Sequence, residues 1–418
     1  MLSADTIEII KAITPAVAAN AGVITRNFYQ RMFAEDPEIQ SFFNQAHQHT
    51  GGQQDALAAA ICAYFTHIEN VDALRPAVEL IAQKHCSLGV KPEHYPTVGK
   101  HLLRAIKEVM GDAADKKIMD AVAEAYQFLS HLCIGREQSV YEEQKAVKCG
   151  WNGFRTFIVE RKVPESDVIT SFYLRRLDER SLPTFKPGQY ITVSIEHPTT
   201  PTSPRNYSLS DRPDVGHFRI SVKREVAMSV GAPDGLISTY LHDNVQQNDC
   251  LQIGPPCGDF TIDSVDDHRP IVMLAGGIGV TPLLSMAKAL VHQNVESRIY
   301  FAQAARNSSV HAFADEVRAL QNGRDNVQTH IVYDQPLDDD VARGKCDQVG
   351  IIDLDWLRDS TPWSEADFYF CGPKPFMQNV YAGLRTLGVD EARIHFEFFG
   401  PRESLVFPAA ADSAPSPV

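Results

Sequence analysis

Apolar residues follow a helical period through the first 150 positions of the chain. In TIEIIKAI, VAANAGVITRNFYQRMF and ALAAAICAYFTHI they recur three and four positions apart, the spacing of one helix face. A long helix is also expected over KKIMDAVAEAYQFLSHLCIGREQSVYEE. Ser3 can cap the first helix and Pro37 can open a short one. The pattern predicts an all-α first domain over residues 1–148.

Beyond residue 150 the period changes twice. QYITVSI and HFRISVK alternate apolar and polar residues, with turns at FKPGQ, DRPDVG and GPPCGD, which predicts an antiparallel β-barrel or sandwich over residues 151–264. From residue 269, the buried strand patterns PIVMLAG, SRIYFAQA and NVQTHIVYD alternate with helical ones, which predicts an α/β domain with a parallel sheet over residues 269–402. Residues 403–418, which end in PAAADSAPSPV, are expected to be a disordered tail.

Composition and charge exclude several classes of protein. Hydrophobic residues make up 44% and charged residues 22% of 418 positions, as in soluble globular proteins, and a net charge of -14 argues against nucleic-acid or anionic-membrane partners. No apolar run is expected to reach transmembrane length, and the N-terminal sequence is not typical of a signal peptide. Eight cysteines without CxxC favour reduced, buried thiols and a cytoplasmic location.

A glycine-rich turn between a buried strand and a helix is a candidate phosphate site. Gly276, Gly277 and Gly279 end the strand pattern, and Thr281 stands at the start of the helix. Glycines let backbone N–H groups approach a phosphate at a helix N-terminus. The pattern is not GxGxxG, and a tight turn without a ligand explains it about as well.

The stretch SPRNYSLS is a second candidate. Arg205 and Tyr207 lie two apart on a predicted strand and therefore share a face. An arginine can hold a pyrophosphate, a tyrosine can lie against a flavin ring, and Ser208 can bond a ring edge. For these residues alone an exposed strand is the better explanation. GLISTYLHDN, FYFCGPKPFM and FEFFGP follow, and each also has a plain structural explanation.

These five motifs in this order resemble the ferredoxin–NADP reductase-like family over residues 151–401. The resemblance implies FAD on the barrel and NAD(P)H on the α/β domain. The FAD contacts it implies are Tyr190, Arg205, Asn206, Tyr207, Ser208 and Ser238. The nicotinamide-nucleotide contacts it implies are Gly276, Gly277, Ile278, Gly279, Val280 and Thr281, with Cys371, Gly372 and Pro373 at the crevice. The residues it places at the flavin are Glu397, Phe398, Phe399, Gly400 and Pro401.

The helical part contains one histidine in an apolar stripe. In AVELIAQKHCSLGV, Val78, Ile81, His85 and Leu88 fall on one face of a helix. A proline in the first turn and a glycine just past the end suit the ends of that helix. On this evidence alone, a buried core histidine is a more common explanation than a metal ligand.

The order Tyr29, Phe43, Gln53, Leu57, His85 resembles the globin pattern, in the bacterial version with a distal tyrosine and glutamine. Residue by residue, a core tyrosine and a surface glutamine remain alternatives. Over the whole chain to about residue 401, the sequence resembles the flavohaemoglobins. The resemblance implies haem b, held non-covalently with its iron on His85 and packed against Phe43 and Leu57.

The same family pairs its iron-bound histidine with a tyrosine and a glutamate. Tyr95 and Glu137 match these positions, and Lys84 matches the family lysine near the haem edge. A carboxylate that accepts the second N–H of such a histidine strengthens it as a donor. Without the resemblance, Tyr95 is typical of a turn aromatic and Glu137 of a solvated helix residue.

The resemblance implies NAD(P)H- and O2-dependent oxidation of nitric oxide to nitrate, with electrons passing from NAD(P)H to FAD to haem. Tyr29 and Gln53 would hydrogen-bond the oxygen, and the substrates O2 and NO would be the only partners of a monomer. Two alternatives stay open: a sensor globin that binds oxygen or NO, and a flavin reductase or oxidase without dioxygenase activity. Arg306 and Ser308 leave the choice between NADH and NADPH open.

Overall fold

The computed structural model describes residues 2–43, 52–196, 203–226, 235–262 and 269–400. Contacts divide the chain into two compact units. One comprises Met1–Arg155, Ile191–Asn206 and Gln252–Asp259, and the other Thr156–Tyr190, Tyr207–Leu251 and Phe260–Val418. The predicted tail, residues 403–418, lies outside the described residues.

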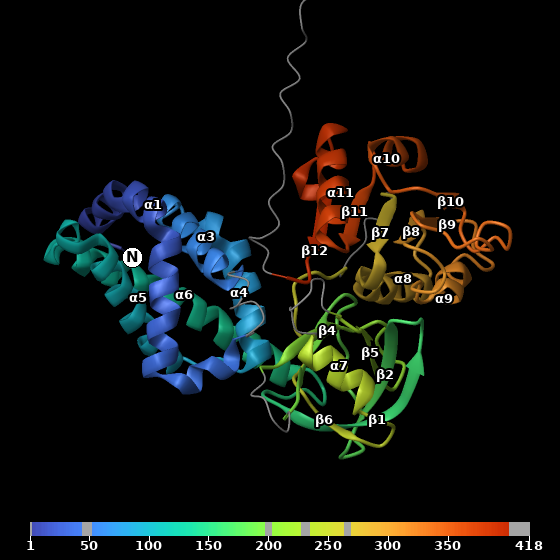
Figure 1. Ribbon diagram of the computed structural model, residues 1–418, viewed down its shortest axis with the longest axis horizontal. Coiled ribbons are helices and arrows are strands. Elements are labelled where there is room, and N and C mark those ends of the chain that lie inside the picture. The colour runs from blue at the N-terminus through green and yellow to red at the C-terminus, as the bar shows by residue number, and fades with distance from the viewer. Residues whose placement is uncertain (1, 44–51, 197–202, 227–234, 263–268, 401–418) are drawn as a thin grey trace, which may run out of the picture. The chain divides into compact units, whose positions relative to one another are not determined.

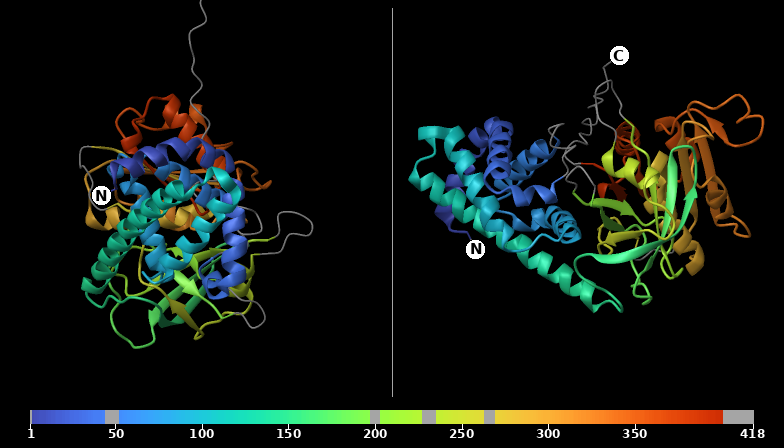
Figure 2. Two further views of the ribbon diagram at one scale, coloured as in Figure 1. Left: turned by 90° about the vertical axis from the view of Figure 1, so that its left-hand side faces the viewer. Right: turned by 60° about the horizontal axis from the view of Figure 1, so that its bottom comes forward.

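The first part of the chain is helical, as predicted (Figures 1 and 2). Its elements are α1 (Ala4–Glu35), η1 (Pro37–Phe42), α3 (Gly52–Thr66), η2 (Val71–Leu74), α4 (Arg75–Leu88), α5 (His94–Met110), η3 (Gly111–Ala113) and α6 (Lys116–Ala146). Ser3 caps α1 by accepting a hydrogen bond from the Thr6 N–H at 3.1 Å, and Pro37 opens η1. Helix α1 packs against α3 and α5, and α4 packs against α6.

Helix α1 differs from the sequence prediction in two ways. The two expected helical stretches form one helix that continues through Pro15, because Ile13 and Val17 on either side are buried on the same core-facing stripe. The expectation that no segment reaches transmembrane length is wrong for α1, which is long and apolar enough by length and composition alone. Its residues Ile10, Ile24 and Phe28 are fully buried in the helical core, and core helices pass the same test.

The buried face of α4 is also not the one predicted. Its fully buried residues include Ala82, Gln83 and Cys86, whereas the stripe that carries His85 is only half-buried. The predicted helix ends are correct, since Pro76 lies in the first turn and Gly89 adopts φ +78° after the last. The prediction was wrong because α4 has uncharged residues on two faces. The face with the smaller side chains, and not the face with His85, packs against α6.

The middle of the chain forms the predicted antiparallel barrel. Its strands are β1 (Arg155–Pro164), β2 (Ile169–Arg176), β3 (Tyr190–Ser194), β4 (Arg205–Ser208), β5 (Phe218–Lys223) and β6 (Cys250–Ile253), in the order β4-β3-β6-β1-β2-β5. An antiparallel bridge between Leu209 and Ile220 joins the end of β4 to β5, so the two ends of this order meet. Helix α7 (Leu236–Asp243) follows β5.

The last part of the chain is the predicted parallel sheet with helices on both faces. Its strands are β7 (Ile271–Gly276), β8 (Ile299–Ala305), β9 (Val327–Tyr333), β10 (Gln348–Val349), β11 (Asp367–Cys371) and β12 (Ile394–Glu397), in the order β10-β9-β8-β7-β11-β12. Its helical elements are η4 (Gly277–Gly279), α8 (Val280–Gln293), α9 (Ala314–Ala319), α10 (Leu354–Ser360), α11 (Lys374–Thr386) and η5 (Glu391–Arg393).

Alternate residues of β7 belong to two different cores. Ile271 and Met273 pack with residues of α8 and α9, whereas Val272 and Leu274 pack with residues of α10 and α11. The two helix pairs accordingly cover opposite faces of the sheet (Figure 1). The carboxyl ends of β7 and β11 lie side by side, since Ala275 pairs with Cys371. This edge is where an open α/β sheet binds its ligand.

Candidate functional site

His85 lies in the last turn of α4 with one ring nitrogen already engaged. Its Nδ1 is 2.7 Å from Oε1 of Glu137 and 3.2 Å from the hydroxyl of Tyr95. The Tyr95 hydroxyl donates to the same carboxylate oxygen. With the Nδ1–H directed at a carboxylate, Nε2 is the nitrogen that can bind a metal.

The two partners of His85 are held by other parts of the helical unit. Glu137 projects from α6 and is 2% exposed, so the alternative of a solvated helix residue is wrong. Tyr95 lies at the start of α5, and its carbonyl accepts a hydrogen bond from the Tyr126 hydroxyl at 2.7 Å. Burial, with the nearby Cys133 and Glu137, raises the pKa of Tyr95, so its phenol stays protonated and can donate.

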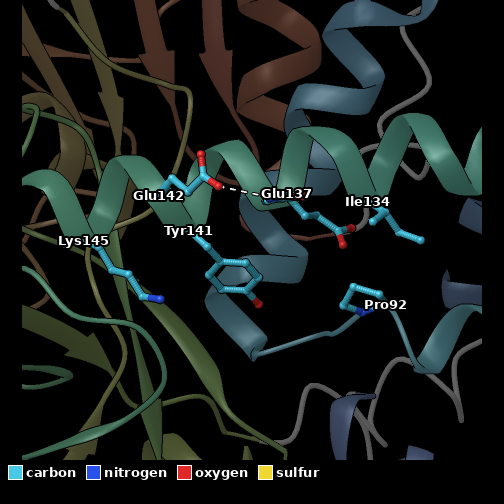
Figure 3. A pocket seen from close by; sticks show the side chains of 7 residues that line it. Pro92, Ile134, Glu137, Tyr141, Glu142 and Lys145 are labelled. Atoms are coloured by element: carbon cyan, nitrogen blue, oxygen red, sulfur yellow. Dashed lines mark hydrogen bonds between the residues drawn. The ribbon is translucent and has the colours of Figure 1, made fainter.

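A pocket of about 300 Å³ lies beside Glu137 (Figure 3). It is lined by Pro92, Ile134, Glu137, Gln138, Tyr141, Glu142 and Lys145. Among the described residues no group bonds Oε2 of Glu137, which is buried. The hydrogen bonds of this carboxylate are therefore concentrated on Oε1, which faces His85 and Tyr95.

The surroundings of His85 fit a flat apolar metal cofactor. Val78, Ile81 and Leu88 lie on the same face of α4 and are only half-buried, which offers an apolar surface beside the ring. Within the described parts of the chain, no group of three His, Cys, Asp or Glu residues lies together as a metal-ligand cluster. Haem is a cofactor that supplies the other ligands of its iron, and a histidine is its usual protein ligand.

The predicted distal residues lie in one aromatic cluster, apart from Gln53. Tyr29 is 6% exposed, and its ring centroid is 5.5 Å from that of Phe43. Phe43 and Leu57 are half-buried and pack against the same core as Tyr29. Gln53 lies in the first turn of α3, and its side chain lies outside the described residues. Lys84 is exposed on α4, one residue before His85.

The predicted flavin residues lie together on β3 and β4. Arg205, Asn206 and Tyr207 are half-buried and Ser208 is buried, so β4 is not the exposed strand that the alternative required. The guanidinium of Arg205 is oriented by Ser203, whose carbonyl and hydroxyl lie 2.7 and 2.6 Å from Nη1. Ser203 thereby fixes the side chain that is predicted to bind a pyrophosphate.

Two residues that support this strand were missed in the sequence. Ser203 orients Arg205, and Thr192 on β3 donates to Oδ1 of Asn206 at 2.8 Å. Thr192 is identified only by the pairing of β3 with β4, whereas Ser203 contacts Arg205 two residues along the chain and is marked in the sequence by nothing but a small hydroxyl side chain. Tyr190, at the start of β3, is buried.

Ser238 lies in the first turn of α7, as a helix N-terminal phosphate site requires. Its hydroxyl donates to the Gly235 carbonyl at 2.9 Å and accepts from the Glu225 N–H at 3.2 Å. The hydroxyl is thus used to hold the turn before the helix. A phosphate at this place would be bound mainly by backbone N–H groups.

Two of the three glycines at the end of β7 are explained by packing. A Cβ on Gly279 would lie 2.2 Å from the carbonyl oxygen of Cys371, and one on Gly276 would lie 2.9 Å from Cδ of Pro373. Gly277 is different, since it adopts φ +52° and has open space where a Cβ would be. A ligand can therefore approach the backbone at Gly277, while Gly276 and Gly279 let the two segments meet.

Of the remaining predicted residues, Ile278 lies in η4, and Val280 and Thr281 begin α8. Val280 is fully buried, Ile278 is half-buried, and the Thr281 hydroxyl donates to the Ile278 carbonyl at 3.0 Å. These side chains fix the turn and leave its backbone to any ligand.

The Cys-Gly-Pro turn and the C-terminal aromatic stretch meet at the same sheet edge. Cys371 pairs with Glu397 across β11 and β12, and burial holds the pKa of the Cys371 thiol well above its ordinary value. Gly372 packs against Gly276, and Pro373 caps α11. The Cys-Gly-Pro turn therefore lies beside the glycine turn at the end of β7.

The two aromatic residues of that stretch are not equivalent. Phe398 packs into the core below the sheet and against Gly400, whereas Phe399 is 46% exposed. Phe399 is the more exposed of the two rings, and the placement of both at the flavin stays a prediction. Pro401 lies outside the described residues.

The thiols of the chain carry no disulfide. The prediction of buried thiols is correct for Cys86, Cys133, Cys257 and Cys371. It is wrong for the other four, since Cys62, Cys149 and Cys346 are half-buried and Cys250 is exposed.

These features define a class of protein: a haem-binding helical domain joined to a reductase that binds a flavin and a nicotinamide nucleotide. Comparison with known families agrees. The globin family model matches residues 26–133, the oxidoreductase FAD-binding domain matches residues 157–262, and the oxidoreductase NAD-binding domain matches residues 273–381.

Relatives match the whole chain. The flavohaemoprotein of Rhodopirellula baltica is 62% identical, over 97% of this chain and 100% of its own, and that of Bacillus cereus is 44% identical over the same shares. A solved flavohaemoglobin from Malassezia yamatoensis with bound FAD and haem has a TM-score of 0.84 at 26% identity, over 96% of this chain and 100% of its own. The chain belongs to the flavohaemoprotein family.

A further solved structure matches the reductase half alone. It is the FAD/NAD-binding domain of a nitric oxide dioxygenase from Vibrio cholerae, with 35% identity and a TM-score of 0.53 over 60% of this chain and 100% of its own. The cofactors of this chain are accordingly haem, FAD and a nicotinamide nucleotide, and it is an NAD(P)H-dependent haem–flavin oxidoreductase.

Proposed function

We propose that this protein is a nitric oxide dioxygenase, which uses NAD(P)H and O2 to convert nitric oxide to nitrate. The observation that carries the proposal is the hydrogen-bonded set of His85, Tyr95 and Glu137 behind the metal-binding nitrogen. A histidine whose Nδ1–H is held by a buried carboxylate donates more strongly through Nε2. That property favours oxygen chemistry over simple carriage of a gas.

Each half of the chain supplies what the other half needs. His85 would hold the haem, which would supply the iron for the reaction of dioxygen with nitric oxide. We propose that Tyr29, which is buried in an aromatic cluster, and Gln53 act as hydrogen-bond donors to dioxygen. The reductase half supplies the electrons. A sensor globin needs no such supply, and this argues against the sensor hypothesis.

The Vibrio cholerae domain supports the proposal, because a reductase half of this kind occurs in a protein named nitric oxide dioxygenase. We further propose that the protein acts as a cytoplasmic monomer with O2 and NO as its only substrates besides the nicotinamide nucleotide. The eight free cysteines are in keeping with a reducing compartment.

The proposal can be tested with purified protein that carries haem and FAD. With NAD(P)H and O2 the protein should consume added nitric oxide and accumulate nitrate. A His85→Ala variant should lose the Soret band and nitrate formation while its flavin is still reduced by NAD(P)H. Continued NAD(P)H oxidation without nitrate in the unaltered protein would reject the dioxygenase and favour a plain flavin oxidase.

A further inference from the structure

Gln83, two residues before His85, joins α4 to a segment of the barrel. Its side chain is buried, at 8% exposure, and both ends of its amide are used. Nε2 donates to Oε1 of Glu79 at 2.8 Å, and Oε1 accepts the backbone N–H of Gly258 at 3.0 Å. Residues 252–259 belong to the same compact unit as the helical domain. The helix that carries the metal ligand is therefore tied directly to this segment.

The direction of the Gln83 amide is fixed by charge. Arg136 on α6 binds Glu79 through both Nε and Nη2, and its Nη1 lies 2.7 Å from Glu143. Glu79 is held as a carboxylate, which accepts hydrogen bonds and cannot donate them. Turning the amide of Gln83 over would place two acceptors together and leave the Gly258 N–H without its partner.

The barrel segment is shaped to meet α4 and α6. Gly258 adopts φ +115°, a conformation that side chains disfavour, and this turns its N–H toward Gln83. Next to it, the buried Cys257 accepts a hydrogen bond from Nε2 of Gln144 on α6 at 3.0 Å. A Cβ on Gly254 would lie 3.4 Å from the Ser87 carbonyl. Two hydrogen bonds, from Gly258 to Gln83 and from Gln144 to Cys257, thus hold the segment.

We propose that Gln83 is a positioning residue for electron transfer from the flavin to the haem. Electrons must cross from the barrel, which holds FAD, to α4, which holds the iron, and the rate of such a step depends on the separation of the two groups. The Gln83 amide fixes α4 against the barrel segment at Gly258, and both residues belong to the same compact unit. The proposal rests on the haem–flavin class of the protein and not on nitrate as the product.

Variants that keep the size of the side chain separate this role from simple packing. Gln83→Leu removes both hydrogen bonds, and Gln83→Glu sets a second carboxylate against Glu79. The double variant Glu79→Gln with Gln83→Glu exchanges donor and acceptor, so that residue 79 donates, residue 83 still accepts from Gly258, and the charge is unchanged. Gln138→Leu is the matched control, because Gln138 is exposed on α6 and bonds only Glu142 among the described residues.

The first readout is anaerobic stopped-flow reduction by NADH of the protein with both cofactors bound. Gln83→Leu and Gln83→Glu should leave the rate of flavin reduction unchanged and slow haem reduction about 10-fold, since small misplacements are costly in position-sensitive steps. The exchanged pair should restore haem reduction to within about 2-fold, and Gln138→Leu should have no effect. The spectrum of the carbon monoxide complex should not change, since His85 keeps its partners.

The second readout needs no turnover. Pro255 and Pro256 carry no amide hydrogen, so deuterium exchange in a peptide over residues 254–258 reports mainly Cys257 and Gly258. Loss of the Gln83 bond should speed exchange at Gly258 about 5-fold, and the exchanged pair should reverse this. Unchanged haem reduction or unchanged exchange in Gln83→Leu overturns the proposal. The proposal is also overturned if flavin reduction slows as much as haem reduction or if the carbon monoxide spectrum changes. It is likewise overturned if the exchanged pair does not restore the rate of haem reduction.

Discussion

At the scale of single residues, the Glu137 carboxylate determines what kind of ligand His85 can be. Its Oε1 faces both the His85 ring and the Tyr95 phenol, and it is buried away from competing water. A carboxylate accepts a hydrogen bond more strongly than an amide oxygen does. Glu137 is accordingly the residue at which a single change should alter the metal ligand without removing it.

Replacing Glu137 with glutamine tests this role. The variant should still bind haem, but its iron–histidine stretching frequency should fall because Nε2 becomes a weaker donor. Turnover should fall by about 10- to 100-fold, as is usual when a hydrogen-bond partner of a metal ligand is changed. Resonance Raman spectra and nitrate formation measure the two effects. Glu142→Gln, on the exposed side of the same pocket, should change neither, and an unaltered frequency in Glu137→Gln would refute the role.

Two glycines of the nucleotide turn give opposite expectations for the same substitution. Gly279→Ala would place a Cβ 2.2 Å from the Cys371 carbonyl, so β7 and β11 would have to separate. We expect a large rise in the KM for NAD(P)H and a less stable α/β domain. Gly277→Ala meets no atom within 4 Å and costs only about 1 kcal/mol for its positive φ. The KM for NAD(P)H of each variant can be measured by steady-state kinetics with ferricyanide as the electron acceptor. An equal rise in KM in the two variants would contradict the packing explanation.

At the scale of elements, a buried charge cluster joins the barrel to the helices of the parallel sheet. Arg219 on β5 is 1% exposed at its side chain and lies 2.6 Å from Glu316 on α9. Lys288 on α8 bridges Asp211, at 2.5 Å, and Glu316, at 3.1 Å. The Ser285 hydroxyl donates to the Asp211 carbonyl at 2.7 Å. Both ligand-binding parts of the reductase are joined by this cluster.

The cluster makes the stability of the reductase depend on pH. Burial opposes ionisation of Asp211 and Glu316, but the neighbouring cations prevail and hold the pKa of both carboxyls below the ordinary value. Their contribution is therefore present at neutral pH and is lost as the pH falls through the lowered values. Arg219→Leu should reduce stability at pH 7 by about 3 kcal/mol and flatten this acid dependence. The free energy of unfolding and its dependence on pH can be measured by urea titrations monitored by flavin fluorescence. A variant as stable as the unaltered protein, with the same acid dependence, would show that the cluster contributes little.

The elements themselves were largely readable from the sequence, because periods of 3.6 and of two are strong signals over long stretches. The exceptions were short or ambiguous. Strand β10 has two residues, and the pattern of α10 is too short to predict a helix. The aromatic residues of β12 do not by themselves predict a strand. The prediction of the buried face of α4 was wrong, because apolar character alone does not show that Ala82 and Cys86 pack against α6 while Ile81 is only half-buried.

At the scale of the whole molecule, the site was predictable only as an ordered set of motifs. His85, Tyr95 and Glu137 come from three helices, and nothing local in the sequence marks Glu137 as buried. The resemblance to a family connected them, and the structure then showed one carboxylate oxygen serving both partners. Gln83 gave no signal, since its role depends on where Gly258 lies and on which group fixes Glu79.

The most direct test of the central claim is the number of nitrate ions formed for each NAD(P)H oxidised. Joining nitric oxide to dioxygen to give nitrate consumes one electron, and NAD(P)H delivers two. With nitric oxide and O2 in excess, nitrate and NAD(P)H measured in the same reaction should therefore show two nitrate ions for each NAD(P)H. NAD(P)H oxidised with little or no nitrate would contradict the account, because the reductase would then be passing its electrons to dioxygen alone.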